Sequence, residues 1–112
     1  MTDKDKIILQ KIIGYIDDVS QYRKGLDADA FLQDKKTVSA CAFAVSQIGE
    51  LTKELTEELQ TTSTAIPWRA IKGMRNRIVH DYENVDFTVL WGTVETSLPD
   101  LKIQLIGLLE NL

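Results

Sequence analysis

The 112-residue sequence has one cysteine, one histidine and two prolines. The single cysteine, Cys41, cannot form an internal disulfide, so we expect it to be a small buried hydrophobic residue. No stretch reaches the roughly 20 apolar residues that cross a bilayer, which argues against a membrane protein. The charged start, residues 1–6, is not followed by the apolar core of roughly 7–15 residues that a secretory signal needs. The sequence therefore predicts a cytoplasmic protein.

Glycine is also scarce, with six residues, and no segment has the composition of a linker. The length matches one domain of roughly 100–150 residues, so we expect residues 1–112 to form a single domain. A hydrophobic content of 44% is typical of a globular protein. The net charge of −4 argues against a protein that covers nucleic acid by bulk positive charge.

One segment departs from this acidic balance. Between Glu58 and Asp81 there is no acidic residue, while four cations fall there: Arg69, Lys72, Arg75 and Arg77. A basic segment within an acidic protein indicates either an anion site or a solvated helix face. On charge alone, the solvated helix face is the favoured interpretation.

Apolar residues recur at spacings of three and four in the first half of the chain, which predicts amphipathic helices. The first helix is expected to begin with Thr2 or Asp3 as its N-cap and to end at about Lys24, with Gly25 in the left-handed conformation that closes a helix. Asp27 and Asp29 could cap a single short turn before residue 34. The side chain of Asp34 can cap a second long helix, expected over 35–59 and followed by a loop over 60–65. Four acidic residues of this second helix lie off its apolar stripe and are expected to be solvated: Glu50, Glu54, Glu57 and Glu58.

The second half of the chain is also expected to be helical. Pro67 suits the first position of a helix, because its missing N–H would have no partner there. Gly73 lies inside that helix at a cost of about 1 kcal/mol relative to alanine, and close approach of another backbone would explain it. Asp86 caps a last stretch that Pro99 must break or kink. The sequence predicts an all-α, up-and-down bundle of four main helices, with the last helix kinked or split at Pro99.

Side chains capable of chemistry gather in residues 75–82, which contain the single histidine, His80. Asn76 lies four positions before His80 on the same helical face, where its amide can bond the imidazole or a ligand beside it. Arg75 and His80 are about 140° apart around an ideal helix and roughly 7.5 Å apart along it. Their side chains therefore do not touch directly, but they could converge on one phosphate.

A purely structural role stays open for these residues. His80, Arg75 and Arg77 lie near a helix C-terminus, where positive charge complements the helix dipole. A metal site is not expected, because there is no second histidine and no ligand cluster nearby. A nucleophilic triad built on Cys41 has no support, and no Gly-rich phosphate loop is present.

The spacing Arg-x4-His-x-Tyr, formed by Arg75, His80 and Tyr82, resembles the HEPN superfamily, and within it the HepT-like (DUF86) toxins. Further segments resemble landmarks of this family in the same order along nearly the whole chain: 31–34, 48–50, 66–68, 73–76 and 98–99. The Arg-x4-His pair is a weak pattern by itself, whereas Gly-Met-Arg-Asn followed by His-x-Tyr is fairly specific.

The resemblance implies a homodimer whose two motif helices line a shared cleft. It also implies a ribonuclease without metal or cofactor, in which the RNA 2′-hydroxyl attacks the adjacent phosphate. In that scheme His80 is the general acid or base, Arg75 stabilises charge on the phosphate, and Asn76 orients His80 or the phosphate. Arg77 and Lys72 are the expected additional contacts to RNA phosphates.

The resemblance further implies a partner and an off-switch. HepT-like toxins are paired with a nucleotidyltransferase antitoxin (MntA-like), which transfers AMP from ATP to the tyrosine of the motif, here Tyr82. An AMP group adds bulk and negative charge that would block and repel RNA. Two alternatives stay open: Tyr82 as an ordinary packing or capping residue, and the whole protein as a non-catalytic helical subunit that binds substrate or a partner nucleotidyltransferase.

Overall fold

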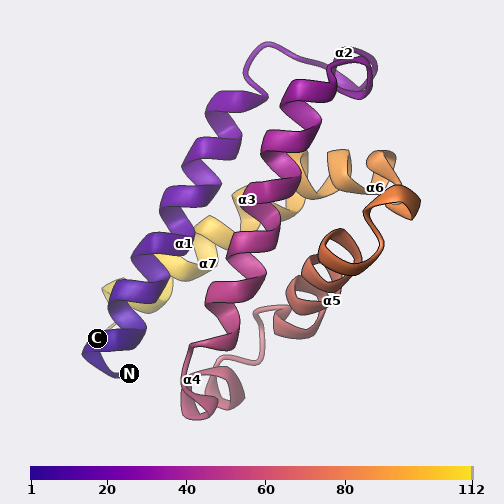
Figure 1. Cartoon of the computed structure of the whole chain (residues 1–112). Coiled ribbons are helices and arrows are strands. Elements are labelled where there is room, and N and C mark those ends of the chain that lie inside the picture. The colour runs from indigo at the N-terminus through magenta and orange to yellow at the C-terminus, as the bar shows by residue number, and fades with distance from the viewer. Residues whose placement is uncertain (112) are drawn as a thin grey trace.

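The computed structural model describes residues 1–111, and helices follow one another along this whole stretch (Figure 1). The long helices are α1 (Asp3–Tyr22), α3 (Lys35–Lys53), α5 (Trp68–His80) and α7 (Leu98–Glu110). The short elements are α2 (Ala28–Gln33), α4 (Glu57–Thr62), the 3-10 turn η1 (Tyr82–Asn84), α6 (Phe87–Gly92) and the π-helical segment η2 (Thr93–Ser97). The described part of the chain has no strand, which confirms the predicted all-α bundle.

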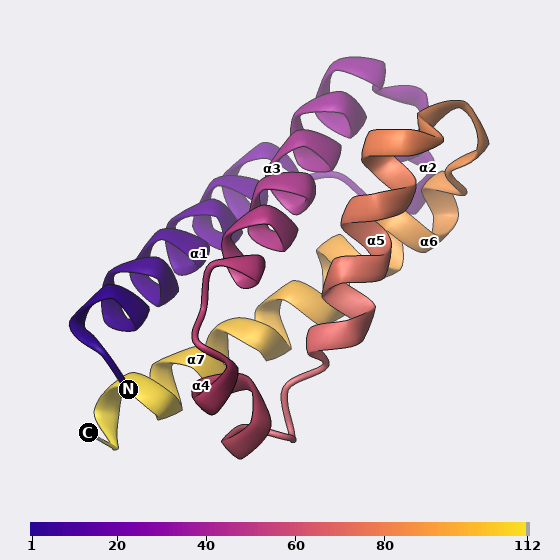
Figure 2. The ribbon, with the colours of Figure 1, turned by 60° about the horizontal axis from the view of Figure 1, so that its bottom comes forward.

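Helix α3 is the central element of this bundle. It packs against α1 on one side and α5 on the other, while α7 crosses below and packs on α1 (Figure 2). The fully buried side chains come mainly from the facing surfaces of these helices, among them Leu9, Ile12, Val19, Ile48 and Leu105. Over residues 1–111, no helix is both long enough and apolar enough to cross a membrane.

The helix expected over 35–59 is in fact two helices. Helix α3 ends at Lys53, and α4 begins at Glu57 after a sharp break. Helix α4 then extends to Thr62, so part of the loop expected over 60–65 is helical. The apolar rhythm continues through the break, which is why periodicity alone predicted one element.

The break is held by Thr56 and Asp5. The Thr56 side chain caps α4, while its N–H and hydroxyl donate to the Asp5 carboxylate at 2.9 and 2.7 Å. Asp5 is fully buried. Burial by itself raises the pKa of this carboxyl, but the hydrogen bonds from Thr56 and Thr2 outweigh it and leave the pKa below its usual value. The start of α1 is thereby tied to the junction between α3 and α4.

The remaining helix ends follow the sequence signals closely. Gly25, in the turn after α1, has φ of 79°, the left-handed conformation predicted for it. The side chains of Asp27 and Asp34 cap α2 and α3. Pro67 is the residue before α5 rather than its first residue, so this boundary differs by one position.

The last helical stretch, predicted to be kinked or split at Pro99, is interrupted by a π-helical segment and has no break at the proline. Pro99 lies in the first turn of α7, and the wider turns of η2 directly precede that helix. A proline ring clashes with the carbonyl four residues earlier in regular α-helix, and a π-helical turn displaces that carbonyl. The chain therefore stays helical from Phe87 to Glu110.

Cys41 and Trp91 are buried core residues near the α2 end of the bundle. Cys41 is fully buried, and burial raises the pKa of its thiol to about 11, which leaves it neutral and confirms the expected packing role. The Trp91 ring packs 5.1 Å from the Phe31 ring and lies under the Arg23 guanidinium at 4.6 Å. These contacts hold α2 against α6.

The close approach of α3 to α5 depends on Gly49. A Cβ atom at this position would overlap Cβ and Cγ of Arg75 and would lie 3.3 Å from the Ile71 carbonyl oxygen. At Gly73, by contrast, no described atom comes within 4 Å of the corresponding Cβ position. The close approach expected at Gly73 is therefore wrong, and the glycine that permits it stands on the facing helix.

We predict opposite effects on stability for two glycine-to-alanine substitutions. Gly49→Ala forces α3 and α5 apart and should lower the free energy of unfolding by about 1–3 kcal/mol. Gly73→Ala meets open space and should raise it by about 0.5–1 kcal/mol, because alanine favours the helix. Urea unfolding of both variants checks this, and equal effects at the two positions would contradict it.

Candidate functional site

Arg75 is held between α3 and α5. Its side chain is 15% exposed, and Nη2 donates to both carboxylate oxygens of Glu50, at 2.6 and 3.2 Å. Its other terminal nitrogen, Nη1, donates to the Asn76 amide oxygen at 2.8 Å. The guanidinium is therefore fixed from two sides, by a carboxylate on the facing helix and by a neighbour on its own helix.

Glu50 is the residue of this cluster that sequence reasoning missed. It was expected to be solvated because it lies off the apolar stripe of α3. It is partly exposed, at 39%, but the absence of a side chain at Gly49 brings the backbone of α5 close enough for Arg75 to reach it. A glycine next to an acidic residue was the available signal, although the sequence did not show which helix would face it.

Asn76 and His80 do not meet as expected. The Asn76 amide oxygen accepts from Arg75, and the His80 imidazole makes no hydrogen bond to residues 1–111. His80 is the last residue of α5 and is exposed, as is Arg77 one turn earlier. Both residues lie in the last turn of α5, where a positive charge complements the negative end of the helix dipole. The geometry is therefore compatible with a purely structural role for them.

Lys72, expected to contact RNA phosphates, has a partner within the chain. Its Nζ donates to the Gln60 side-chain oxygen of α4 at 2.7 Å. Arg77 is exposed. Of the two cations proposed as additional phosphate contacts, only Arg77 is therefore presented openly to solvent.

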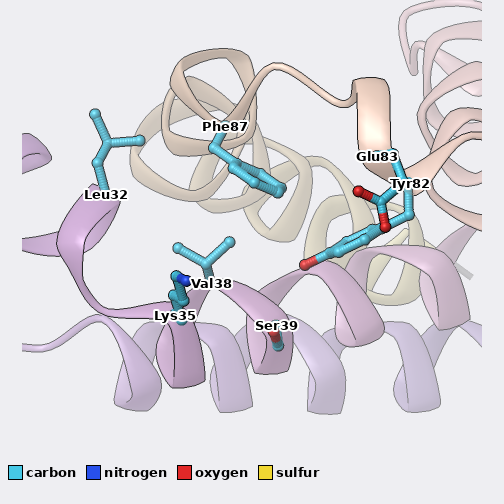
Figure 3. Close-up of a pocket in the computed structure, with 7 residues that line it drawn as sticks. All are labelled: Leu32, Lys35, Val38, Ser39, Tyr82, Glu83 and Phe87. Atoms are coloured by element: carbon cyan, nitrogen blue, oxygen red, sulfur yellow. The ribbon is translucent and has the colours of Figure 1, made fainter.

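Tyr82 lies apart from the Arg75 cluster. It begins η1 just after α5, is 37% exposed, and its ring packs 5.6 Å from the Phe87 ring with the planes tilted by 55°. Figure 3 shows the Tyr82 hydroxyl pointing across a pocket toward α3. This pocket has a volume of about 410 Å³ and is not lined by Arg75 or His80. The contact with Phe87 also leaves the packing interpretation of Tyr82 open.

The motif therefore divides into two neighbouring parts. One part is the cluster of Arg75, Asn76 and Glu50 between α3 and α5, and the other is the pocket beside Tyr82. His80 stands between them along the chain. Within residues 1–111, no three His, Cys, Asp or Glu side chains gather closely enough to hold a metal ion.

The amino-acid sequence, compared with known proteins, identifies the family to which this all-α bundle belongs. The chain belongs to the HepT-like ribonuclease family, whose model matches residues 12–107. It is 34% identical to "Probable ribonuclease HepT" of Thermococcus cleftensis over 102 aligned residues. The alignment covers 91% of this chain and 93% of that protein.

Two further relatives carry provisional RNase names. One, from Methanocaldococcus jannaschii, is 27% identical over 107 residues, covering 96% of this chain and 92% of its own length. Another, from Caldanaerobacter subterraneus, is 30% identical over 88 residues, covering 79% of each chain. No solved structure matches this chain.

We predict that Arg75 and Glu50 stabilise the fold as a coupled pair. In a double-mutant cycle of Glu50→Gln and Arg75→Met, the coupling energy should be about 1 kcal/mol, because the pair is only partly exposed. The coupling should shrink in 1 M salt. Glu54→Gln is the control, because Glu54 is an exposed acidic residue at the end of α3. This substitution should change the free energy of unfolding by less than about 0.5 kcal/mol. A coupling energy near zero would contradict the pairing.

Proposed function

We propose that the protein is a metal-independent ribonuclease in which Arg75 and His80 act on one phosphodiester. The observation that carries this proposal is the fixed guanidinium of Arg75 on the same helix as an exposed imidazole, in a chain of the HepT-like family. Relatives named as ribonucleases support the same activity.

The proposed reaction is an internal transfer at phosphorus. The 2′-oxygen of RNA bonds to the adjacent phosphorus as the bond from phosphorus to the 5′-oxygen breaks, leaving a cyclic phosphate and a 5′-hydroxyl. One proton leaves the 2′-hydroxyl and one reaches the 5′-oxygen. Imidazole both accepts and donates protons near neutral pH, so His80 serves one of these transfers. A homodimer with a shared cleft would bring a second His80 for the other.

Arg75 is suited to the charge that builds on the phosphate. A guanidinium stays charged and offers several N–H donors in one plane. Glu50 and Asn76 bind only its terminal nitrogens and orient it, which reduces the reorganisation needed in the transition state. Asn76 is thus proposed to position Arg75 rather than His80. Arg77 would add an RNA phosphate contact, and Lys72 could do so only by leaving Gln60.

We further propose that this ribonuclease is the toxin of a toxin–antitoxin pair and is switched off at Tyr82. An MntA-like nucleotidyltransferase antitoxin would transfer AMP from ATP to the phenolic oxygen, with release of pyrophosphate. The 37% exposure of Tyr82 supports access by such an enzyme. The added phosphate would repel RNA close to His80.

A second candidate function is a non-catalytic helical subunit that binds substrate or a nucleotidyltransferase partner. The net charge of −4 and the pI of about 4.9 favour this second function, because a negatively charged protein does not attract RNA by bulk charge. Purified protein that leaves RNA intact, yet forms a stable complex with the partner, would support this second function over the first.

We predict that Arg75→Ala and His80→Ala each abolish RNA cleavage and growth arrest. The loss should be about 10²–10⁴-fold for His80, as for other acid–base residues, and about 10²–10³-fold for Arg75. Cleavage is measured in EDTA on RNA and on the same strand with 2′-deoxy nucleotides, which should stay uncut. Arg69→Ala, exposed on the same helix, is the control. Wild-type rates in both motif variants would refute the proposed site.

We predict that the modification occurs on Tyr82. The protein, incubated with ATP and an MntA-like nucleotidyltransferase, should gain the mass of one or more AMP units and lose ribonuclease activity. Tyr82→Phe should gain none, whereas Tyr22→Phe should be modified like the wild type, because Tyr22 is also exposed but lies on α1. Intact-mass spectrometry distinguishes these outcomes, and AMP on the Tyr82→Phe protein would exclude Tyr82 as the acceptor.

A further inference from the structure

The pocket beside Tyr82 has the size and lining of a small-ligand site. It measures about 410 Å³ and lies between α2, the first turns of α3, η1 and the start of α6 (Figure 3). Volumes of roughly 300–1,000 Å³ are typical of such sites. None of the residues of the Arg75 cluster lines it.

One side of this pocket is apolar and partly aromatic. Tyr82 and Phe87 contribute two rings in contact, and Leu32 and Val38 contribute aliphatic side chains. Leu32 and Tyr82 are 39% and 37% exposed, so apolar surface is left open to water. A flat aromatic ligand would cover that surface, and nucleobases stack on such side chains regardless of their sequence.

The other side of the pocket carries polar groups of both signs. Lys35 is exposed and forms no ion pair within residues 1–111. Ser39 and the Tyr82 hydroxyl supply hydrogen-bonding groups, and the hydroxyl is bonded to no group of the described chain. Glu83 supplies a carboxylate that can accept from an exocyclic amino group. Stacking surface, mixed polar edges and one free cation together suit a nucleotide better than a purely apolar ligand.

We propose that this pocket binds a nucleotide, with its base against Tyr82 and Phe87 and its phosphate toward Lys35. The choice of ligand rests on the proposed ribonuclease function. Two residues of chain span at most about 7 Å, so the backbone of Tyr82, which lines the pocket, lies within that distance of the His80 backbone. A nucleotide of the RNA substrate could therefore occupy it during cleavage. An adenylyl group on the Tyr82 oxygen, which already points across the pocket, would occupy the same space and exclude that nucleotide.

Titration of the whole protein with free nucleotides tests the pocket without catalysis. AMP should shift the methyl resonances of Leu32 and Val38 in a saturable way, whereas ribose 5-phosphate and inorganic phosphate should not, since they lack a base. Ser39→Trp places a ring in the pocket from an exposed position and should abolish the shifts. Equal shifts with AMP and ribose 5-phosphate would overturn the proposal.

A pair of charge reversals keeps the test decisive if the tryptophan variant does not fold. Lys35→Glu should weaken AMP binding about tenfold, by removing one phosphate contact and adding repulsion. Lys36→Glu is the matched control, because Lys36 is an exposed neighbour in the same helical turn that does not line the pocket. If both variants weaken AMP binding equally, the effect comes from the net charge of the protein. The assignment of Lys35 as a phosphate contact would then be overturned.

Two further measurements identify the source of the nucleotide. If RNA occupies the pocket, Ser39→Trp should raise KM for RNA with little change in kcat. If the adenylyl group occupies it, protein modified on Tyr82 should show the shifted Leu32 and Val38 resonances without added AMP. AMP binding without RNA cleavage would retain the pocket and reject the ribonuclease. RNA cleavage by wild-type protein that shows no pocket shifts with AMP would reject the pocket alone.

Discussion

The arrangement of this protein depends on one close contact, the passage of α5 over Gly49 of α3. A side chain at that position would collide with Arg75, so the two helices could not approach as they do. Their approach in turn lets the guanidinium reach Glu50 at 2.6 Å. A packing constraint in the middle of the bundle therefore sets the position of the charged group that is proposed to meet RNA.

The same contact explains how Arg75 can be largely withdrawn from water and still serve the proposed reaction. A guanidinium that is 15% exposed loses much of its hydration, and Glu50 and Asn76 replace part of it with fixed partners. A preorganised charge needs little rearrangement when an anion arrives. His80 shows the opposite arrangement, an exposed side chain at a helix end without a partner in the described chain.

Tyr82 extends the motif onto a second surface. It follows α5 directly, but its ring packs with Phe87 and its hydroxyl points across a pocket formed with α2 and α3. A group attached there would thus lie beside the Arg75 cluster rather than within it. In the proposed scheme, modification would block RNA by filling an adjacent nucleotide site and by repulsion, without disturbing the ion pair of Arg75 with Glu50.

The sequence by itself determined the helical class, most helix ends and the membership of the HepT-like family, because these follow from local signals. Apolar spacing, the caps at Asp27 and Asp34, and the left-handed Gly25 each act within a few residues. Only the tertiary structure decided the break at Thr56, which depends on Asp5 about fifty residues away. It alone paired Arg75 with Glu50 across 25 positions and brought Leu32 to Tyr82. Such contacts depend on which helix faces which, and no local pattern specifies that choice.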